Sequence, residues 1–105
     1  MQLKKTLHYN TLFDIYEKLL TKRQREVYIF YYHEDLSYQE IADILNISKA
    51  AVYDTVKRTT DFLEDTEKKL GINDKYVKII SELEKLNDPK VNAILEQFDR
   101  GGNYE

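Results

Sequence analysis

The amino-acid sequence predicts an all-α protein built around a helix-turn-helix, with a long fourth helix and a C-terminal helical extension. Three observations lead to this fold class. The 105 residues include only three Gly and one Pro, at Gly71, Pro89 and Gly101-Gly102, so the chain has few places to turn except between helices. Apolar residues recur at helical spacing along most of the chain. The stretch from Leu36 to Arg58 carries the caps and the turn of a helix-turn-helix.

Two helices are expected before this motif. The first runs from Leu7 to Leu20, and its buried side is predicted to hold Leu12, Phe13, Tyr16, Leu19 and Leu20. Thr21 is suited to cap the second helix, which covers KRQREVYIFYYHE. In that helix Val27, Phe30 and Tyr31 form the expected buried stripe, while Arg23 and Arg25 remain outside.

The motif itself contains two helices joined by a tight turn. Ser37 and Glu40 have the spacing of a capping box, which starts a helix from about Tyr38 to Leu45. Asn46 tolerates the left-handed conformation that the turn needs, and Ser48 caps the next helix. The side chains expected to face inward between the two helices are Ile41, Leu45, Ile47 and Val52, with the small Ala42 where the helices cross.

The helix that follows Ser48 is expected to run from about Lys49 to Leu70, where Gly71 is a natural C-cap. Its apolar and small positions, in steps of four and three, are Val52, Val56, Thr59, Leu63, Thr66 and Leu70. We expect this seam to be covered by the segment from Lys75 to Leu86, folded back on it, or by a second copy of the chain. The matching stripe is Tyr76, Ile79, Ile80, Leu83 and Leu86.

The last helix is expected to start at Asp88-Pro89, because Asp caps well and Pro is favoured at the first helical position. Its apolar side is Val91, Ile94, Leu95 and Phe98. The expected organisation is one all-helical domain over residues 1–100, with the helix-turn-helix core at 21–60 and C-terminal helices at 74–98. Residues 101–105 are expected to form a flexible tail.

The composition narrows the class of protein. There is no Cys, which fits a reducing compartment, no apolar run long enough to span a bilayer, and no signal-peptide core in MQLKKTLHYN. We therefore expect a cytoplasmic protein. The net charge is −3, and the acid lies in the C-terminal part. Residues 1–60 carry nine Lys/Arg against eight Asp/Glu, whereas residues 61–105 carry seven against eleven.

Enzymatic and metal sites are not indicated. His8 and His33 are the only histidines, and neither has an acidic or histidine partner at the spacing that builds a metal site on a helix. The sequence contains no Ser/His/Asp constellation, P-loop or Gly-rich phosphate cradle. The sequence therefore predicts a protein that is not an enzyme and that uses no cofactor or metal.

The start of the fourth helix carries the candidate nucleic-acid-binding residues. In a DNA-reading helix-turn-helix this part of the helix enters the major groove, and nearby cations hold phosphates. Asp54 complicates this interpretation, since it either accepts a hydrogen bond from cytosine or repels the backbone. The candidate residues are Lys49, Ala50, Tyr53, Asp54, Lys57 and Arg58, with Arg23 and Arg25 from the second helix.

Two further features have competing interpretations. The nine tyrosines are more simply explained as helix core with hydroxyls at the surface than as base-stacking platforms, although stacking is favoured more for the outward-facing Tyr53. The charged run from Asp61 to Leu70 is either a solvated helix face with i,i+4 pairs or an acidic surface for a basic partner.

The middle third of the chain, LTKRQREVYIFYYHEDLSYQEIADILNISKAAVYDTVKR from Leu20 to Arg58, resembles the fourth region of bacterial sigma factors, a helix-turn-helix that reads promoter DNA. The rest of the chain has no counterpart of the polymerase-binding regions. The resemblance therefore implies a fold similar to sigma region 4 and does not imply a complete sigma factor.

A resemblance to the YlxM-type family of small bacterial proteins covers the first 70 residues. It rests on YNTLFDIYEKLLT, YYHEDLSYQEIAD and NISKAAVYDTVKRT, followed by LEDTEKKL, and AVYD with Lys57-Arg58 is the most distinctive piece. The resemblance implies a role in the signal recognition particle pathway, inferred for the family from gene neighbourhood, together with DNA binding inferred from the fold. It supplies no catalytic residues.

Two hypotheses follow. The preferred one is a non-enzymatic regulator whose helix-turn-helix binds DNA or the RNA of the signal recognition particle. The alternative is a protein-interaction adaptor whose acidic C-terminal half docks the particle's GTPase or its receptor without reading DNA. A homodimer is also expected, because paired half-sites would help a weakly basic protein to bind DNA.

Overall fold

The computed structural model describes the backbone of residues 3–101 and the side chains of residues 5–98. The helices are α1 (Leu3–Tyr16), α2 (Lys22–Tyr28), α3 (Tyr38–Leu45), α4 (Lys49–Leu70), α5 (Ile72–Glu84) and α6 (Pro89–Gly101). No strand occurs among the described residues, and the predicted all-α class is confirmed. The expected flexible tail lies, from residue 102 on, outside the described residues. The division into one domain stays a prediction.

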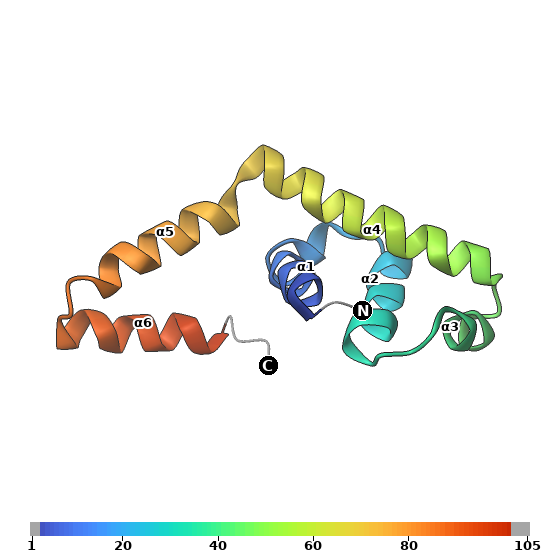
Figure 1. Ribbon diagram of the computed structural model, residues 1–105, viewed down its shortest axis with the longest axis horizontal. Helices are drawn as coiled ribbons and strands as arrows, with labels where there is room; N and C mark the ends of the chain where they lie inside the picture. Colours follow the sequence, from blue (N-terminus) through green and yellow to red (C-terminus); the bar gives the residue numbers. More distant parts are fainter. Residues whose placement is uncertain (1–2, 102–105) are drawn as a thin grey trace.

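Helix α4 is the longest helix and the one on which the others are arranged (Figure 1). Its buried stripe contains Val52, Val56, Thr59, Leu63 and Thr66, as predicted, but Leu70 is exposed. Helices α1, α2 and α3 cover this stripe.

The expectation that Lys75–Leu86 folds back on the buried stripe of α4 is wrong. Helix α5 leads away from α4, because Gly71 ends α4 in the left-handed conformation (φ 64°) and α1 and α2 already occupy the stripe.

The N-terminal part of the core lies between α1, α2 and the middle of α4. Its buried members are Leu12, Phe13, Tyr16, Leu20, Tyr28 and Leu63. The rings of Phe13 and Tyr28 stack with centroids 4.3 Å apart. Helix α1 ends at Tyr16, and a 3₁₀ turn, Glu17–Leu19, follows it. This turn changes the direction of the side chains, so Leu19 is exposed, contrary to the prediction.

The helix-turn-helix has the caps and the turn that the sequence predicts. Ser37 and Glu40 form both hydrogen bonds of a capping box, at 3.1 and 2.8 Å. Asn46 ends α3 in the left-handed conformation (φ 56°). The Ser48 hydroxyl accepts a hydrogen bond of 3.0 Å from the Ala51 N–H and so caps α4. The core behind these caps is built from Val27, Ile41, Ala42, Val52 and Val56.

The second helix differs from its prediction at its C-terminal end. The α-helical part stops at Tyr28, and a π-helical turn, Ile29–His33, continues it, with the Glu34 N–H donating to the Ile29 carbonyl at 3.0 Å. A π turn contains one residue more than an α turn, so it rotates the following side chains around the axis. Phe30 and Tyr31, which lie within the turn and were predicted to be buried, are therefore only partly buried, whereas Tyr28, just before the turn, is buried.

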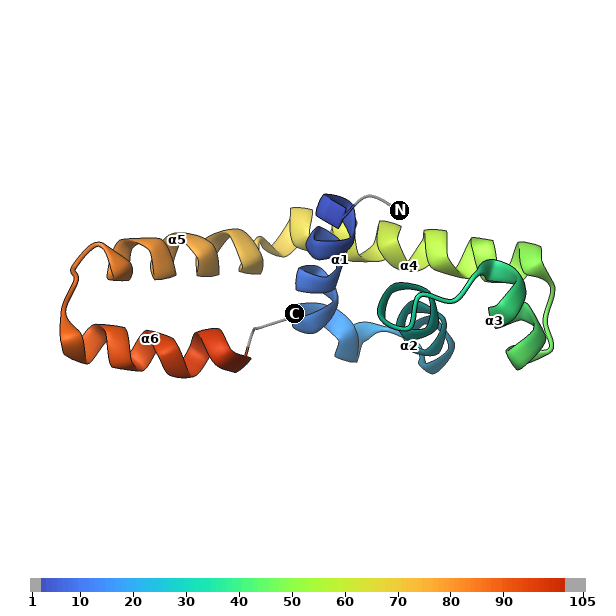
Figure 2. The same cartoon turned by 60° about the horizontal axis from the view of Figure 1, so that its bottom comes forward.

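Helices α5 and α6 form an antiparallel hairpin that projects from the rest of the protein (Figure 2). Helix α5 begins at Ile72, before the predicted start, and α6 begins at Pro89 as predicted. The radius of gyration is 16.5 Å, against roughly 13 Å for a compact chain of this length. Leu95 is the buried hydrophobic residue of the described part of the hairpin, while Ile79, Leu86, Ile94 and Phe98 are exposed.

A carboxylate near the end of α4 connects this hairpin to the core. Glu67 accepts hydrogen bonds from the Tyr16 hydroxyl at 2.7 Å and from the N–H groups of Asn73 and Asp74, both at 3.1 Å. Partial burial would raise the pKa of Glu67, but these hydrogen bonds outweigh it and the pKa is lowered. Burial and the bond to Glu67 raise the pKa of Tyr16 to about 12. Glu67 therefore ties α1, α4 and α5 together as an ionised group.

We predict that Glu67→Gln lowers the free energy of unfolding by about 1–2 kcal/mol at pH 7, because the hydrogen bonds lose a charged acceptor. A carboxyl whose pKa is depressed in the folded state stabilises the protein above its unfolded-state pKa, near 4.5, and loses this effect as the pH falls through the folded-state value. Urea unfolding of wild type and variant at several pH values should therefore show the difference shrinking below about pH 4.5. Glu82→Gln on α5 is the control. A difference independent of pH would contradict the ionised junction.

Candidate nucleic-acid interface

The six candidate residues of α4 lie together on one exposed surface. Lys49, Tyr53 and Lys57 form one row at i,i+4 spacing, and Ala50, Asp54 and Arg58 form a second row beside it. All six side chains are exposed, because the buried stripe takes the opposite positions of the helix. We call these six residues the α4 surface. The short turn between Asn46, which ends α3, and Ser48, which caps α4, fixes the position of the α4 surface relative to α3.

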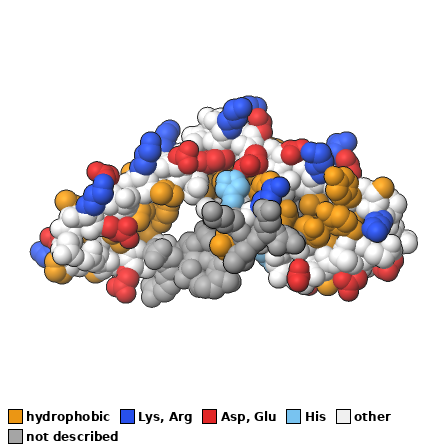
Figure 3. Space-filling model, viewed as in Figure 1, with side chains coloured by type: hydrophobic (Ala, Val, Ile, Leu, Met, Phe, Trp, Pro, Cys, Tyr) orange, Lys and Arg blue, Asp and Glu red, His pale blue; other side chains and the backbone are white. Residues whose placement is uncertain are grey.

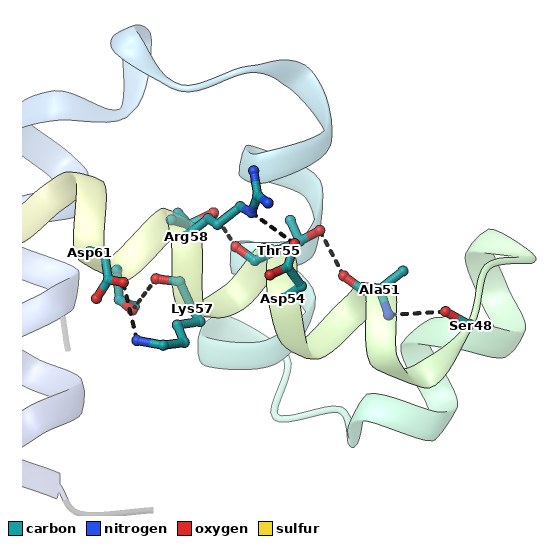
Figure 4. Close-up of polar contacts among 9 residues, drawn as sticks. Ser48, Ala51, Asp54, Thr55, Lys57, Arg58 and Asp61 are labelled. Carbon is teal, nitrogen blue, oxygen red and sulfur yellow. Dashed lines mark hydrogen bonds and ion pairs between the residues drawn. The ribbon is translucent and has the colours of Figure 1, made fainter.

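Carboxylates neutralise much of the positive charge on the α4 surface. Arg58 Nε lies 2.8 Å from Asp54 Oδ2, and Lys57 Nζ lies 3.2 Å from Asp61 Oδ2 (Figure 4). The hydrogen bond and the negative charge of Asp61 raise the pKa of Lys57. Lys49 forms no ion pair with another described residue. Two of the three cations of the α4 surface, Lys57 and Arg58, are therefore already paired within the helix.

The two arginines of α2 are placed differently from each other. Arg23 is exposed and lies 3.8 Å from Glu26. Arg25, predicted to remain outside, is partly buried; its Nη2 donates to the Leu20 carbonyl at 3.5 Å and its Nε lies 3.8 Å from Glu17. Arg25 thus holds the connection between α1 and α2. Among the described residues, no hydrogen bond or ion pair joins either arginine to the α4 surface.

An open cavity, which was not predicted from the sequence, lies beside the α4 surface. Its volume is about 510 Å³. Five tyrosines from α1, the π turn, α3 and α4 line it, namely Tyr9, Tyr31, Tyr32, Tyr38 and Tyr53. In the space-filling view, hydrophobic side chains, tyrosines included, gather on the face that α2 and α4 share (Figure 3). Because the π turn sets the direction of Tyr31 and Tyr32, helical periodicity alone does not reveal this cavity.

Neither a metal-binding cluster nor a membrane-spanning helix occurs in the described part of the chain. Within the described side chains, no group of three His, Asp or Glu residues is placed to hold a metal ion. None of the described helices is long and apolar enough to cross a membrane.

Comparison with known proteins agrees with this architecture. The family described as "Putative helix-turn-helix protein, YlxM / p13 like" (UPF0122) matches residues 3–100, and this description names no enzymatic activity. The UPF0122 proteins of Staphylococcus aureus strains Newman and Mu3 are each 53% identical to the chain over 68 residues. The matched segment is 65% of this chain, and the chain spans 62% of the length of these relatives.

We predict that Asp54→Asn changes the free energy of unfolding by less than about 0.5 kcal/mol, because an exposed i,i+4 ion pair contributes little to stability. Urea unfolding followed by circular dichroism measures the change. Leu63→Ala, in the buried stripe of the same helix, is the contrasting control and should cost about 3 kcal/mol. A loss above 2 kcal/mol for Asp54→Asn would show that the pair is structural.

Proposed function

The chain belongs to the YlxM/p13-like family of helix-turn-helix proteins, and from this membership we propose that it is a regulatory protein that binds nucleic acid through the α4 surface. The observation that carries the proposal is the gathering of Lys49, Tyr53, Lys57 and Arg58 on one exposed face at the start of α4. A helix in this position of the motif lies with its first residues in a groove, and cations further along contact phosphates.

The ion pairs of the α4 surface are compatible with this role. Pairs between exposed side chains on flexible stems are worth little, so Lys57 and Arg58 can exchange Asp61 and Asp54 for phosphate oxygens at small cost. The two carboxylates then remain close to the nucleic acid and reduce the attraction. We therefore propose weak, salt-dependent binding by one copy of the chain, and paired copies would bind more tightly.

We further propose that the protein acts in the signal recognition particle pathway. The support is the resemblance of the Ala51–Asp54 segment, with Lys57 and Arg58, to YlxM-type proteins, for which that role is inferred from gene neighbourhood. In this proposal the nucleic acid is DNA or the RNA of the particle, and binding to each is measured separately.

We predict that the double variant Lys57→Ala/Arg58→Ala weakens binding to duplex DNA or to the particle RNA. It should also reduce the slope of log K against log salt by about 1.8 for duplex DNA, because two phosphate contacts are lost. Fluorescence anisotropy over a salt series measures both quantities. Asp54→Asn should act in the opposite direction and tighten binding.

Lys68→Ala/Lys69→Ala is the matched control for this measurement. It removes two adjacent cations from the other end of the same helix, where both are exposed. Unchanged binding in the Lys57→Ala/Arg58→Ala variant, or an equal loss in the two double variants, would refute the α4 surface as the interface.

A second candidate function has its own structural support in the α5–α6 hairpin. The hairpin projects from the core and leaves Ile79, Leu86, Ile94 and Phe98 exposed, and it belongs to the acidic part of the chain. An exposed apolar face bordered by charge is typical of a protein interaction site. We propose, as the alternative, that the hairpin docks the GTPase of the signal recognition particle or its receptor without a nucleic acid.

This alternative predicts that Ile94→Asp abolishes capture of the purified GTPase or receptor at physiological salt after nuclease treatment, because a charge is then buried in an apolar contact. Ile44→Asp on α3 is the control, since the two isoleucines are exposed to a similar extent, 53% and 56%. Capture that disappears when nuclease is added would instead indicate a nucleic-acid bridge and would refute the adaptor.

A further inference from the structure

We propose that the tyrosine-lined cavity beside α4 binds one unpaired base of a nucleic-acid strand that lies on the α4 surface. The inference rests on the proposed binding of nucleic acid and adds to it a pocket and a preference for a strand with an unpaired nucleotide.

The cavity has the size and the walls of a site for a planar ring. Its volume of about 510 Å³ lies within the range of small-molecule sites, roughly 300–1,000 Å³. Tyr31 and Tyr38 stack with centroids 4.8 Å apart, and Tyr53 meets Tyr38 edge-on at 5.6 Å. Aromatic faces of this kind stack on any base, because every base has a π face.

Polar groups accompany the rings. Burial raises the pKa of Tyr9, Tyr32 and Tyr38, that of Tyr32 to about 12, so these hydroxyls stay protonated at neutral pH and both donate and accept hydrogen bonds. Lys5, Lys57 and Asp61 also line the cavity. The lysines suit the phosphates of the bound nucleotide, and the Asp61 carboxylate suits an exocyclic amino group.

The position of the cavity connects it to the proposed interface. Tyr53 and Lys57 belong both to the α4 surface and to the wall of the cavity, so a strand held on this surface passes the mouth of the cavity. A paired base reaches such a pocket only after it is flipped out of the stack, which costs a few kcal/mol. A bulged or looped nucleotide presents its base without that cost.

Simple core packing does not explain Tyr53. Tyr28 shows what a core tyrosine is like in this protein: it is 1% exposed, and its hydroxyl donates to Asn10 at 2.7 Å. Tyr53 is 53% exposed and lies at the edge of the tyrosine-lined cavity. A base stacked on the Tyr53 ring would cover its exposed part and extend the group of aromatic rings beside it.

The test uses two labelled RNA hairpins with the same stem, one fully paired and one with a single bulged adenosine, in fluorescence anisotropy with the full chain. Wild type should bind the bulged hairpin more tightly. Tyr53→Ala should weaken binding to the bulged hairpin about tenfold, as expected for one lost stacking contact, and should weaken binding to the paired hairpin less, so that the preference for the bulge is lost. Tyr53→Phe keeps the ring and should keep the preference.

Tyr76→Ala on α5 is the matched control, because Tyr76 is 43% exposed and lies outside the cavity, and circular dichroism verifies that each variant is folded. Equal wild-type affinity for the two hairpins, or an equal effect of Tyr53→Ala and Tyr76→Ala, would overturn the pocket. Saturation by free AMP without preference for the bulge would also overturn it, by assigning the cavity to a free nucleotide.

The same titrations separate this inference from the proposed function. The Lys57→Ala/Arg58→Ala variant should weaken binding to both hairpins. If it does so while wild type shows no preference for the bulge, the pocket is refuted and the α4 surface stands. If neither hairpin binds to wild type, both are refuted for RNA.

Discussion

The buried stripe of α4 is the constraint on which the other helices depend. Helix α4, with 22 residues, belongs to the helix-turn-helix at one end and to the N-terminal core at the other. Three helices therefore pack against it at different positions along its length. Three of the buried residues of α4 are threonines, and the hydroxyls of two of them donate to the carbonyl four residues earlier, Thr59 to Thr55 at 2.7 Å and Thr60 to Val56 at 3.2 Å. The polar atoms are thereby satisfied within the helix, and burying them costs little. With this stripe covered, the opposite side of α4 is left for binding.

The charges on that opposite side explain why a helix-turn-helix can be present without a strongly basic domain. A DNA-binding protein gains most of its affinity from Lys and Arg side chains that contact phosphates. In this protein Lys57 and Arg58 already have carboxylate partners in the same helix. The paired cations lower affinity for any polyanion and leave more of the discrimination to shape and to neighbouring rings. This balance fits a ligand that is recognised by local structure better than one that is held by charge alone.

The parts of the fold that the sequence predicts are those governed by local rules. The caps at Ser37 and Ser48, the left-handed Asn46 and the end of α4 at Gly71 follow from residue chemistry alone, and all are present. The failures concern the 3₁₀ and π turns, which change the burial of Leu19, Phe30 and Tyr31, and the long-range placement of α5. No local rule says whether the segment after Gly71 turns back or leads away, since that depends on which helices already cover α4.

For the candidate site, by contrast, the sequence is enough to predict that all six α4 residues share one face, because helical spacing alone places them. The functional role of those residues stays a prediction, and the cavity beside them needs tertiary structure to be seen.

The π-helical turn at Ile29–His33 has a consequence for how this sequence can change. One residue of a helix corresponds to about 100° of rotation, so deleting a residue there would restore a regular helix and swing Tyr31 and Tyr32 to another side. The helix-turn-helix after the turn would keep its own caps at Ser37 and Ser48, while the aromatic wall beside α4 would be lost. The π turn thus sets the rotation of α2 relative to the helix-turn-helix. A relative that lacks the turn would share the helix-turn-helix but not the tyrosine-lined cavity.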